Sequence, residues 1–408
     1  MGGASRSFFW CYASSNAQPA SLVRLKKIFI VFAILALIGL GIFFFAVPRY
    51  IDANHNKVTG VAPAQTQSGD LHQRLIVADL HADSLLWDRD LLKENDWGHV
   101  DIPRLIKGNI ALQGFAVVTK TPRGLNIERN SAATDNIRLL SFAQRWPPRT
   151  WSSLQQRALY QAQKLHEFAA RSKGALVVIK SRADLQAYLV KRRTQSGVTA
   201  GWLTIEGAHA LEGELANLDA LYQAGFRMIS PTHLADSEIG ASASGESQRG
   251  LTELGEKWVA QMERRNIIID LAHASARTID DVLRLSSRPV IVSHTGAKGT
   301  CDNNRNLSDA QIQHIASKGG LIGVGFWQYA TCAADIAAIV KAIRYVVNIA
   351  GIEHVALGSD WDGYVATPID AAGMGAITTA LQLAGFDEAS ISNIMGENTV
   401  RFLLRALP

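Results

Sequence analysis

The chain has 408 residues, of which 48% are hydrophobic and 19% are charged. This composition is that of an ordinary globular protein, long enough for one large or two modest domains. Six basic and two acidic residues lie in residues 1–72, so the net charge of +5 leaves about +1 for the rest of the chain. That remainder offers no basic surface for nucleic acid, and we expect no nucleic-acid partner.

An apolar stretch occupies residues 28–47 and contains no charged or strongly polar side chain. Twenty helical residues at 1.5 Å per residue match the ~30 Å hydrocarbon core of a bilayer. Arg24, Lys26 and Lys27 precede the stretch, and basic residues on this flank favour a cytoplasmic N-terminus. The stretch therefore predicts a single-pass anchor that binds the lipid bilayer and leaves the rest of the chain outside the cytoplasm.

A cleaved signal peptide is the alternative reading of this stretch. Its apolar region would normally span only ~7–15 residues, and the nearest cleavage-like sequence, Ala62-Pro63-Ala64, lies far downstream with proline at its centre. We favour the uncleaved anchor. The predicted organisation is a cytoplasmic segment (1–27), a transmembrane anchor (28–47), a polar linker (48–72) and one folded domain (73–408).

From residue 75 onward, short apolar runs alternate with longer amphipathic stretches. The runs lack the polar alternation of a half-exposed strand, which favours a parallel sheet covered on both faces. About eight such units fit an α/β fold of the closed (β/α)8 TIM-barrel type better than an open sheet. The strand candidates are LIVADL, IALQGFAVV, GALVVI, VTAGWLTI, FRMISPT, NIIIDLA, RPVIVS, GLIGVGF and HVALGS.

The chain has three cysteines. Cys11 is expected on the cytoplasmic side, whereas Cys301 and Cys332 lie in the exported part, where oxidation is permitted. The sequence leaves open whether this second pair forms a disulfide or stays as two buried thiols. Neither belongs to a Cys-x-x-Cys motif, so a zinc–thiolate site is not expected.

Histidines and carboxylates follow the predicted strands at equivalent positions. The carboxyl ends of parallel barrel strands open on one face, so these side chains should converge at one mouth. Imidazoles and carboxylates without thiolates suit zinc or a similar divalent ion, and the set is large enough for two ions. The candidates are His81, Asp83, Glu206, His233, His273, His294 and Asp360.

Each of these residues also has a structural interpretation, because a single histidine at a strand end is usually a satisfied polar residue. Several such coincidences on one face are much less expected than one. Asp362 competes with Asp360 for the mouth, and we favour Asp360 because it lies closer to the apolar run. Five further histidines lack the strand-end position and are expected to be structural or exposed: His99, His166, His209, His314 and His354.

Over residues 75–363 the motifs resemble those of the renal, or membrane, dipeptidases, a metallopeptidase branch of the amidohydrolase-like barrels. The resemblance implies zinc-dependent hydrolysis of a dipeptide by a hydroxide that bridges two zinc ions. The matching stretches are DLHAD, IEGAHAL, MISPTH, RGLTELGEKWVAQMERRNIIIDLAHAS, PVIVSHT, CDNNRNLSDAQIQHIASKGGLIGVGF and HVALGSDWDG.

The resemblance also implies a role for each site residue. One zinc ion would be held by His81 and Asp83 and the other by His273 and His294, with Glu206 bridging the two. Three further residues would act on the substrate. His233 would donate to the developing oxyanion, Arg305 would bind the substrate carboxylate, and Asp360 would shuttle a proton.

Two other functions stay open from the sequence. The same site could act on another small amide, such as an N-acyl amino acid, a peptide with a D-residue or a β-lactam, because the pocket loops are not readable from one sequence. A catalytically silent, tethered maturation factor is the second alternative. The tail RFLLRALP lacks a GPI signal, and the N-terminal anchor suggests the outer side of a bacterial inner membrane. Whether the chain forms a homodimer is not decided.

Overall fold

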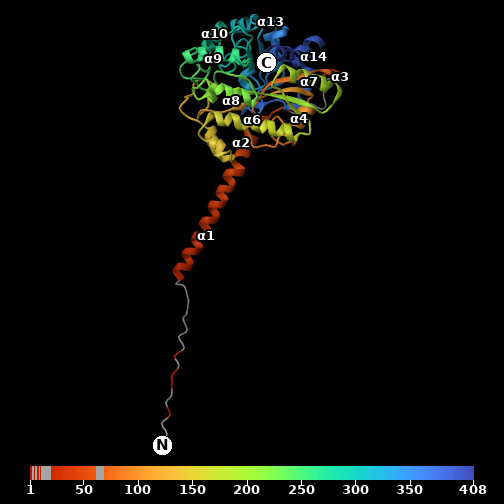
Figure 1. Ribbon diagram of the computed structural model, residues 1–408. Coiled ribbons are helices and arrows are strands. Elements are labelled where there is room, and N and C mark those ends of the chain that lie inside the picture. Colours follow the sequence, from red (N-terminus) through yellow and green to blue (C-terminus); the bar gives the residue numbers. More distant parts are fainter. Residues whose placement is uncertain (2–3, 5–6, 9, 11–19, 61–68) are drawn as a thin grey trace.

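The computed structural model of the chain describes residues 20–60 and 69–408, together with residues 1, 4, 7, 8 and 10. Cys11, residues 62–64 of the signal-peptide alternative and part of the expected linker lie outside the described residues. A long N-terminal helix projects from a barrel built by the rest of the chain (Figure 1).

Eight parallel strands of the described chain form the ring of the barrel, in the order β7-β6-β5-β3-β2-β10-β9-β8. A parallel bridge between Asp270, just after β7, and Ile291 of β8 closes the ring. The predicted (β/α)8 barrel is therefore confirmed, whereas β4 (Leu176–Val178) pairs only with β5, off this path. The ring strands are β2 (Val77–Ala82), β3 (Ile110–Val118), β5 (Thr199–Glu206), β6 (Phe226–Ile229), β7 (Ile268–Ile269), β8 (Ile291–Thr295), β9 (Leu321–Val324) and β10 (Val355–Leu357).

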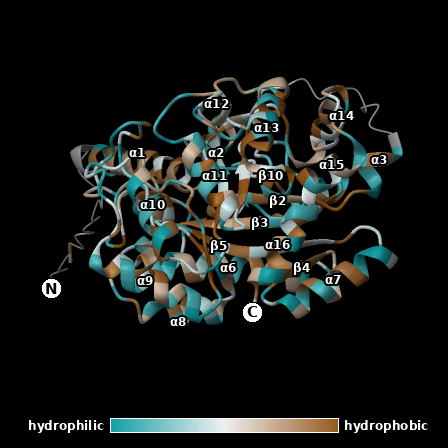
Figure 2. Ribbon diagram, turned by 90° about the horizontal axis from the view of Figure 1, so that it is seen from above, coloured by the Kyte–Doolittle hydropathy of each residue, from teal (hydrophilic) through white to brown (hydrophobic). Residues whose placement is uncertain are grey.

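The strands are buried along their whole length, as their uninterrupted apolar sequence predicts. Every residue of β2, β3 and β5 is buried, because side chains on one face fill the barrel and those on the other meet the surrounding helices. Figure 2 shows these hydrophobic strands in the interior, with hydrophilic helix faces turned outward. At one end, Phe402 and Leu403 of the C-terminal helix α16 (Asn398–Ala406) join the barrel core.

Local signals in the sequence start several of the outer helices. Thr252, Ser275 and Asp335 each accept a hydrogen bond from a backbone N–H in the first turn of the helix that follows, which satisfies a donor that the helix itself cannot pair. The helices around the barrel are α3 (Gly69–Arg74), α4 (Ile102–Lys107), α5 (Ile137–Ala143), α6 (Leu154–Arg171), α7 (Arg182–Thr194), α8 (Asn217–Ala224), α9 (Glu253–Arg264), α10 (Ala276–Leu285), α11 (Asp309–Ser317), α12 (Gln328–Thr331), α13 (Ile336–Ala350), α14 (Gly375–Leu383) and α15 (Glu388–Ser392).

A disulfide joins Cys301 and Cys332, which answers the question that the sequence leaves open. Cys301 belongs to the loop after β8, and Cys332 directly follows α12. The same loop carries Arg305, whose backbone N–H donates to Asn303 Oδ1 over 2.9 Å. The bridge thus restrains the segment that presents this arginine.

The N-terminal helix has three parts, α1 (Ala20–Gly41), a π-helical turn (Ile42–Ala46) and α2 (Val47–His55). Pro48 has no N–H to continue the α-helical pattern, and the Val47 N–H instead donates to the Ile42 carbonyl. The window that qualifies as a membrane span has a mean hydropathy of 3.0, and none of it is buried in the protein. Length and composition therefore allow this helix to cross a bilayer.

The segment that follows the apolar stretch is folded where the sequence predicts a polar tether. Asp52 of α2 is only 2% exposed, and its carboxylate lies 3.0 Å from Nε of Arg89. NH2 of the same arginine lies 2.8 Å from Oδ2 of Asp362, in the loop after β10. Next along the chain, β1 (Lys57–Val58) pairs with β11 (Ala366–Thr367). Residues 48–58 of the expected polar linker are thus folded against the barrel, because distant residues neutralise and bury the charge of Asp52.

Replacement of Arg89 by alanine should destabilise the fold strongly. The change leaves Asp52 and Asp362 buried without their cation, and removing one partner of a buried ion pair costs about 3–5 kcal/mol. Denaturant unfolding of the full chain in detergent measures this loss. The matched control is Arg74→Ala, because the Arg74–Glu388 pair is exposed and should cost less than about 1 kcal/mol. Equal stability of the two variants would contradict a structural role for the buried pair.

Candidate metal centre

The carboxyl ends of the barrel strands carry the candidate ligands, as the sequence predicts. His81 and His294 lie within β2 and β8, and Glu206 is the last residue of β5. Three more candidates follow their strands by three or four residues: His233 after β6, His273 after β7 and Asp360 after β10. All are buried. Strand ends that are far apart in sequence therefore meet at one mouth of the barrel.

Four imidazoles surround the carboxylate of Glu206. Its Oε1 atom lies 2.8 Å from Nε2 of His273, 3.3 Å from Nε2 of His294 and 3.5 Å from Nε2 of His81. Its Oε2 atom lies 3.0 Å from Nε2 of His233. The Nε2 atoms of His273 and His294 are themselves 3.0 Å apart. Glu206 is thus the common neighbour of imidazoles from four strands.

A second group of ligand atoms adjoins the first. His81, Asp83 and Asp360 each offer one atom, and these atoms lie within 4.8 Å of one another. The same limit groups His81 with Glu206 and His294, and Glu206 with His233 and His273. The groups overlap through His81 and Glu206, which is the pattern that a two-ion centre with a shared carboxylate requires. The ligands of each ion stay a prediction.

Among the described residues, several buried candidate ligand atoms make no well-aligned hydrogen bond, although other atoms of the cluster lie close to them. They are Nε2 of His81, Oδ1 of Asp83 and Oε1 of Glu206. A buried polar atom without a partner is unfavourable, and proteins retain such atoms mainly where a ligand, ion or water satisfies them. Imidazole and carboxylate donors without thiolate suit zinc or a similar divalent ion. The residues present therefore fit a metal centre.

Electrostatics at the mouth favours the presence of cations. Burial and the nearby Asp83 carboxylate raise the pKa of Glu206 well above its usual value, and burial raises the pKa of Asp360 to about 8. Burial would lower the pKa of His81, but Asp83 and Glu206 outweigh it and raise that pKa to about 10. These pKa shifts arise because buried carboxylates are crowded together with too little positive charge nearby. Bound divalent cations would supply that charge.

The other imidazoles are held neutral. Burial is the main cause that lowers the pKa of His273 and of His294 well below the usual value, and the charge of Arg305 adds to it. Burial, followed by the neighbouring His209, lowers the pKa of His233 to about 3. A neutral imidazole keeps a ring-nitrogen lone pair for a metal ion.

Two residues that sequence reasoning missed support the ligands from behind. The Ser293 hydroxyl lies 2.9 Å from Nδ1 of His294 and 3.3 Å from Nδ1 of His81. Its oxygen can accept an N–H from both rings, which leaves both Nε2 lone pairs facing the cluster. Asp79 accepts hydrogen bonds from Gln113 Nε2 and from the Ser359 backbone and hydroxyl. It thereby ties β2, which carries His81, to the loop after β10.

The loop after β10 separates the two aspartates that compete for the mouth. Asp360 joins the ligand cluster, whereas Asp362 turns away and accepts from Ser84 Oγ over 2.6 Å and from the His99 backbone N–H over 2.7 Å. Both aspartates have φ of +63°, a conformation that is strained for residues other than glycine. At Gly363, an added Cβ would lie 2.4 Å from Asp360 Oδ1 and 2.9 Å from Asp83 Oδ2, so only glycine fits.

Arg305 lies beside the cluster without joining it. Its side chain is buried, and NH2 donates to the His294 carbonyl over 2.8 Å. The guanidinium carbon lies 5.7 Å from the centre of the Trp327 ring. Burial lowers its pKa, whereas Asp360 and Glu206 oppose that shift, so the group stays a cation next to the carboxylates.

The histidines that the sequence assigns to structural roles lie outside the cluster. Nε2 of His209 is 3.0 Å from the Asp236 carbonyl, and Nδ1 of His99 accepts from the Asp362 backbone N–H over 3.0 Å. His166 and His354 likewise contact backbone carbonyls, and His314 is exposed on α11. Each of the four hydrogen-bonded histidines thus has a backbone partner that accounts for its position.

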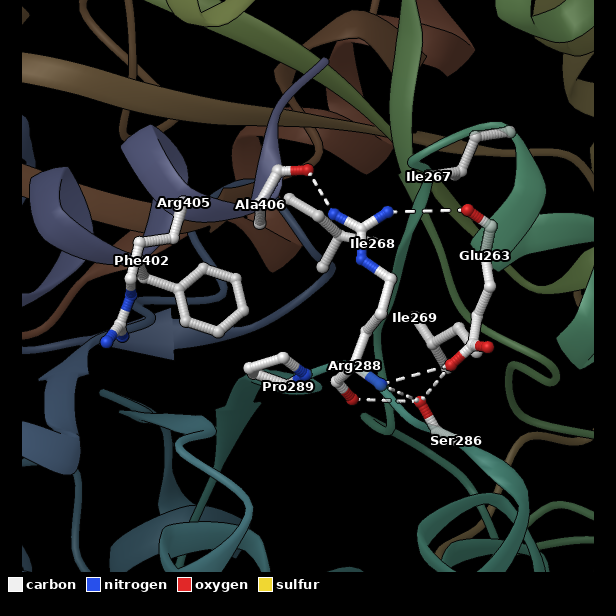
Figure 3. Close-up of a pocket in the computed structure, with 10 residues that line it drawn as sticks. All are labelled: Glu263, Ile267, Ile268, Ile269, Ser286, Arg288, Pro289, Phe402, Arg405 and Ala406. Atoms are coloured by element: carbon white, nitrogen blue, oxygen red, sulfur yellow. Dashed lines mark hydrogen bonds between the residues drawn. The ribbon is translucent and has the colours of Figure 1, made fainter.

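A hollow of about 60 Å³ lies at the other end of the barrel, between the starts of β7 and β8 and the helix α16 (Figure 3). Arg288 crosses it, and its NH2 donates to the Ala406 carbonyl over 2.8 Å. Ser286 and the Arg288 backbone N–H donate to Glu263 Oε1 over 2.9 and 3.1 Å. Polar groups here pair with each other, and none of the candidate ligands lines the hollow, so we assign no chemistry to it.

Comparison with known proteins gives a consistent result. The family model described as membrane dipeptidase (peptidase family M19) matches residues 65–406. Dipeptidase aclJ of Aspergillus oryzae is 28% identical over 308 residues, which is 71% of this chain and 68% of that protein. A Klebsiella pneumoniae protein from the pqqA 5′ region is 31% identical over 59% of this chain and 92% of its own length.

Solved structures agree with the barrel. The crystal structure of dipeptidase AC, a metallopeptidase of family M19, is 25% identical with a TM-score of 0.68 and covers 82% of this chain and 99% of its own. A metallopeptidase from Rhodobacter sphaeroides, bound to a phosphinate mimic of the dipeptide L-Ala-D-Ala, is 24% identical with the same TM-score and the same coverage. At that identity, the second structure supports the fold alone.

Replacement of Glu206 by glutamine should remove metal from the site, because an amide cannot share one negative charge between two cations. We expect the purified variant to lose both bound ions, measured by elemental analysis after dialysis against zinc. The matched control is Glu256→Gln, since Glu256 is exposed on α9, and it should keep the wild-type metal content. Full occupancy in Glu206→Gln would rule out the bridging position.

Proposed function

The chain belongs to the membrane dipeptidase family (peptidase family M19), and we propose that it hydrolyses dipeptides with two zinc ions held at the barrel mouth. Its class is that of a metallopeptidase that acts as a dipeptidase. The observation that carries the proposal is the convergence of imidazoles from four strands on Glu206, beside buried ligand atoms that lack a partner. Buried polar atoms without a partner, grouped among imidazole and carboxylate side chains, suit a site that binds a cation.

The ligand assignment follows the overlap of the groups. His81 and Asp83 would hold one ion, His273 and His294 the other, and Glu206 would bridge them. The ions would polarise the scissile carbonyl and make a hydroxide available near neutral pH. The chain's own contribution is to hold the ligands rigidly, through Ser293 behind the imidazoles.

Three residues beside the ligands would act on the substrate. Asp360 would take the proton of the attacking water and pass it to the leaving nitrogen, a role that suits a buried carboxylate beside the ligand cluster. His233 is kept neutral in the cluster, and its Nε2–H would donate to the carbonyl oxygen as negative charge develops there. Arg305 would bind the carboxylate of the substrate with its planar set of donors.

This arrangement explains a preference for dipeptides over longer chains. If Arg305 binds the terminal carboxylate while the carbonyl meets the ligand cluster, the residue after the scissile bond must be the last one. A longer peptide presents no carboxylate at that distance. N-acyl amino acids keep the carboxylate but lack the free amine, so a comparison of dipeptides with acylated analogues separates the two substrate classes.

The anchor would place the barrel outside the cytoplasm. The basic residues Arg24, Lys26 and Lys27 precede the apolar stretch, and an excess of such residues favours the cytoplasmic side. The protein would then act at the periplasmic or extracellular face of a bacterial inner membrane. The disulfide between Cys301 and Cys332 agrees with an oxidising compartment.

Replacement of Arg305 by alanine should weaken substrate binding. Charge-assisted hydrogen bonds contribute about 1.5–3 kcal/mol, so KM for an unmodified dipeptide should rise about 10- to 100-fold, with a smaller change in kcat. The control is a dipeptide with an amidated C-terminus, which has no carboxylate to bind. Wild type and variant should hydrolyse that amide with similar KM, and a loss of equal size on both substrates would exclude the proposed contact.

Replacement of Asp360 by asparagine should slow the chemical step. Loss of a general acid–base group lowers kcat about 10²- to 10⁴-fold, and we expect KM to change little. Steady-state kinetics on the same dipeptide measures the effect, and elemental analysis of the variant provides the control. Two ions still bound would assign the loss to proton transfer, whereas loss of an ion would make Asp360 a ligand instead.

A further inference from the structure

The anchor fixes how deep its own residues lie in the bilayer. The apolar stretch of residues 28–47 is just long enough for the ~30 Å hydrocarbon core. Phe43, Phe44 and Phe45 are in its last turns, so they mark the outer boundary of that core. Any part of the barrel that packs beside these residues must lie at the same depth.

Helix α5 packs at this level. The ring of Phe142 lies 5.4 Å from the ring of Phe44 and 6.1 Å from that of Phe43, measured between centroids. Arg145 follows α5 and donates to the Phe44 carbonyl, and its guanidinium carbon lies 4.3 Å from the centre of the Phe45 ring. The end of α5 is therefore beside the anchor where the anchor leaves the hydrocarbon region.

The outer side of α5, next to the anchor, exposes apolar surface and has basic residues nearby. Leu139 is 57% exposed and Phe142 is 39% exposed, three residues apart and so on one side of the helix. Arg138 in α5, Arg145 just after it and Arg149 in the next turn are exposed, and Arg145 also pairs with Asp88 over 2.6 Å. We call these five residues the α5 patch. Apolar side chains with arginines at their rim suit the boundary between acyl chains and anionic headgroups, where arginine extends towards the phosphates.

We propose that the α5 patch is a second membrane contact, in which Leu139 and Phe142 enter the bilayer boundary and the arginines bind anionic lipid headgroups. The inference rests on the membrane anchoring proposed above. Asp52 and Arg89 lock the anchor to the barrel, so the patch cannot swing away from the bilayer once the helix is inserted. Two contacts fix the tilt of the barrel, whereas a single free helix would leave it to pivot.

Fluorescence quenching by lipid tests this contact in the full chain. The disulfide leaves Cys11 as the remaining thiol among the three cysteines, so Leu139→Cys in a Cys11→Ser background takes one fluorophore. The labelled protein is reconstituted into vesicles of phosphatidylcholine and phosphatidylglycerol that contain nitroxide-labelled lipid. We expect the label at position 139 to be quenched at least threefold more than a label on the far side of the barrel, and less so in vesicles without phosphatidylglycerol.

Leu383→Cys provides the far-side control. Leu383 is 85% exposed at the end of α14, and the next residue, Ala384, accepts a hydrogen bond from Arg344 of α13. Helix α13 lies on the side of the barrel away from α1 (Figure 1). Both positions are exposed leucines, so the two labels differ mainly in their position on the barrel.

An alkaline carbonate wash of the vesicles tests the proposed membrane anchor separately from the proposed α5 contact, because it releases protein that is not inserted in the bilayer. Equal quenching at both positions in carbonate-resistant protein would overturn the α5 contact and leave the anchor intact. Protein that is washed off would overturn both. The label at position 139 could instead become less accessible as the protein density in the vesicles rises, while nitroxide-labelled lipid does not quench it. That result would assign the patch to a contact with a second copy of the chain and overturn the lipid contact.

Discussion

The site depends on closure of the barrel. Strands β7 and β8 are the two ends of the hydrogen-bonded order of strands. His273 follows β7, and His294 lies in β8. In an open sheet these histidines would lie at opposite edges. The bridge between Asp270 and Ile291 curls the sheet into a ring, and the two Nε2 atoms come to 3.0 Å from each other. Asp270 also accepts from the Ser293 backbone N–H over 2.8 Å, so one aspartate links closure to ligand placement.

Strand position explains why much of this site is predictable from the sequence. A polar residue at the end of an apolar strand must lie at the barrel mouth, and that rule places His81, Glu206 and His294 without coordinates. The rule does not extend to supporting residues. Ser293 precedes the candidate ligand His294 but resembles any other strand serine. The role of Asp79 depends on Ser359, which lies 280 positions away in the sequence. Such partners are set by three-dimensional packing, which local pattern does not encode.

The anchor segment is a second example of a contact that the local sequence pattern does not predict. Asp52 belongs to a polar, glycine- and proline-containing region that is typical of a linker, yet it is buried against Arg89. The signal that would reveal it is a complementary charge 37 residues along the chain, and surface charges of that kind are common. Burial of an ion pair often contributes little net stability but favours one arrangement over others. Here the pair joins α2 to Arg89 of the barrel.

That ion pair also connects the anchor to the loop after β10, which carries Asp360. Arg89 lies between Asp52 and Asp362, and Asp362 is two residues from Asp360. Asp360, Asp362 and Tyr364 all have positive φ, which is strained for residues of these types. A strained loop keeps its shape only where its surroundings over-determine it, and the Asp362 contacts to Ser84, His99 and Arg89 do so.

Stability and function are opposed at the mouth itself. Each buried polar atom without a partner costs about 1–3 kcal/mol, and the cluster holds such atoms on His81, Asp83 and Glu206. An apolar filling would be more stable and would bind no ion. The chain keeps these atoms unpaired and places the compensating contacts behind them, in Ser293 and Asp79. A cation that satisfies the cluster would therefore stabilise the fold while it completes the site, which links the two properties through the same few atoms.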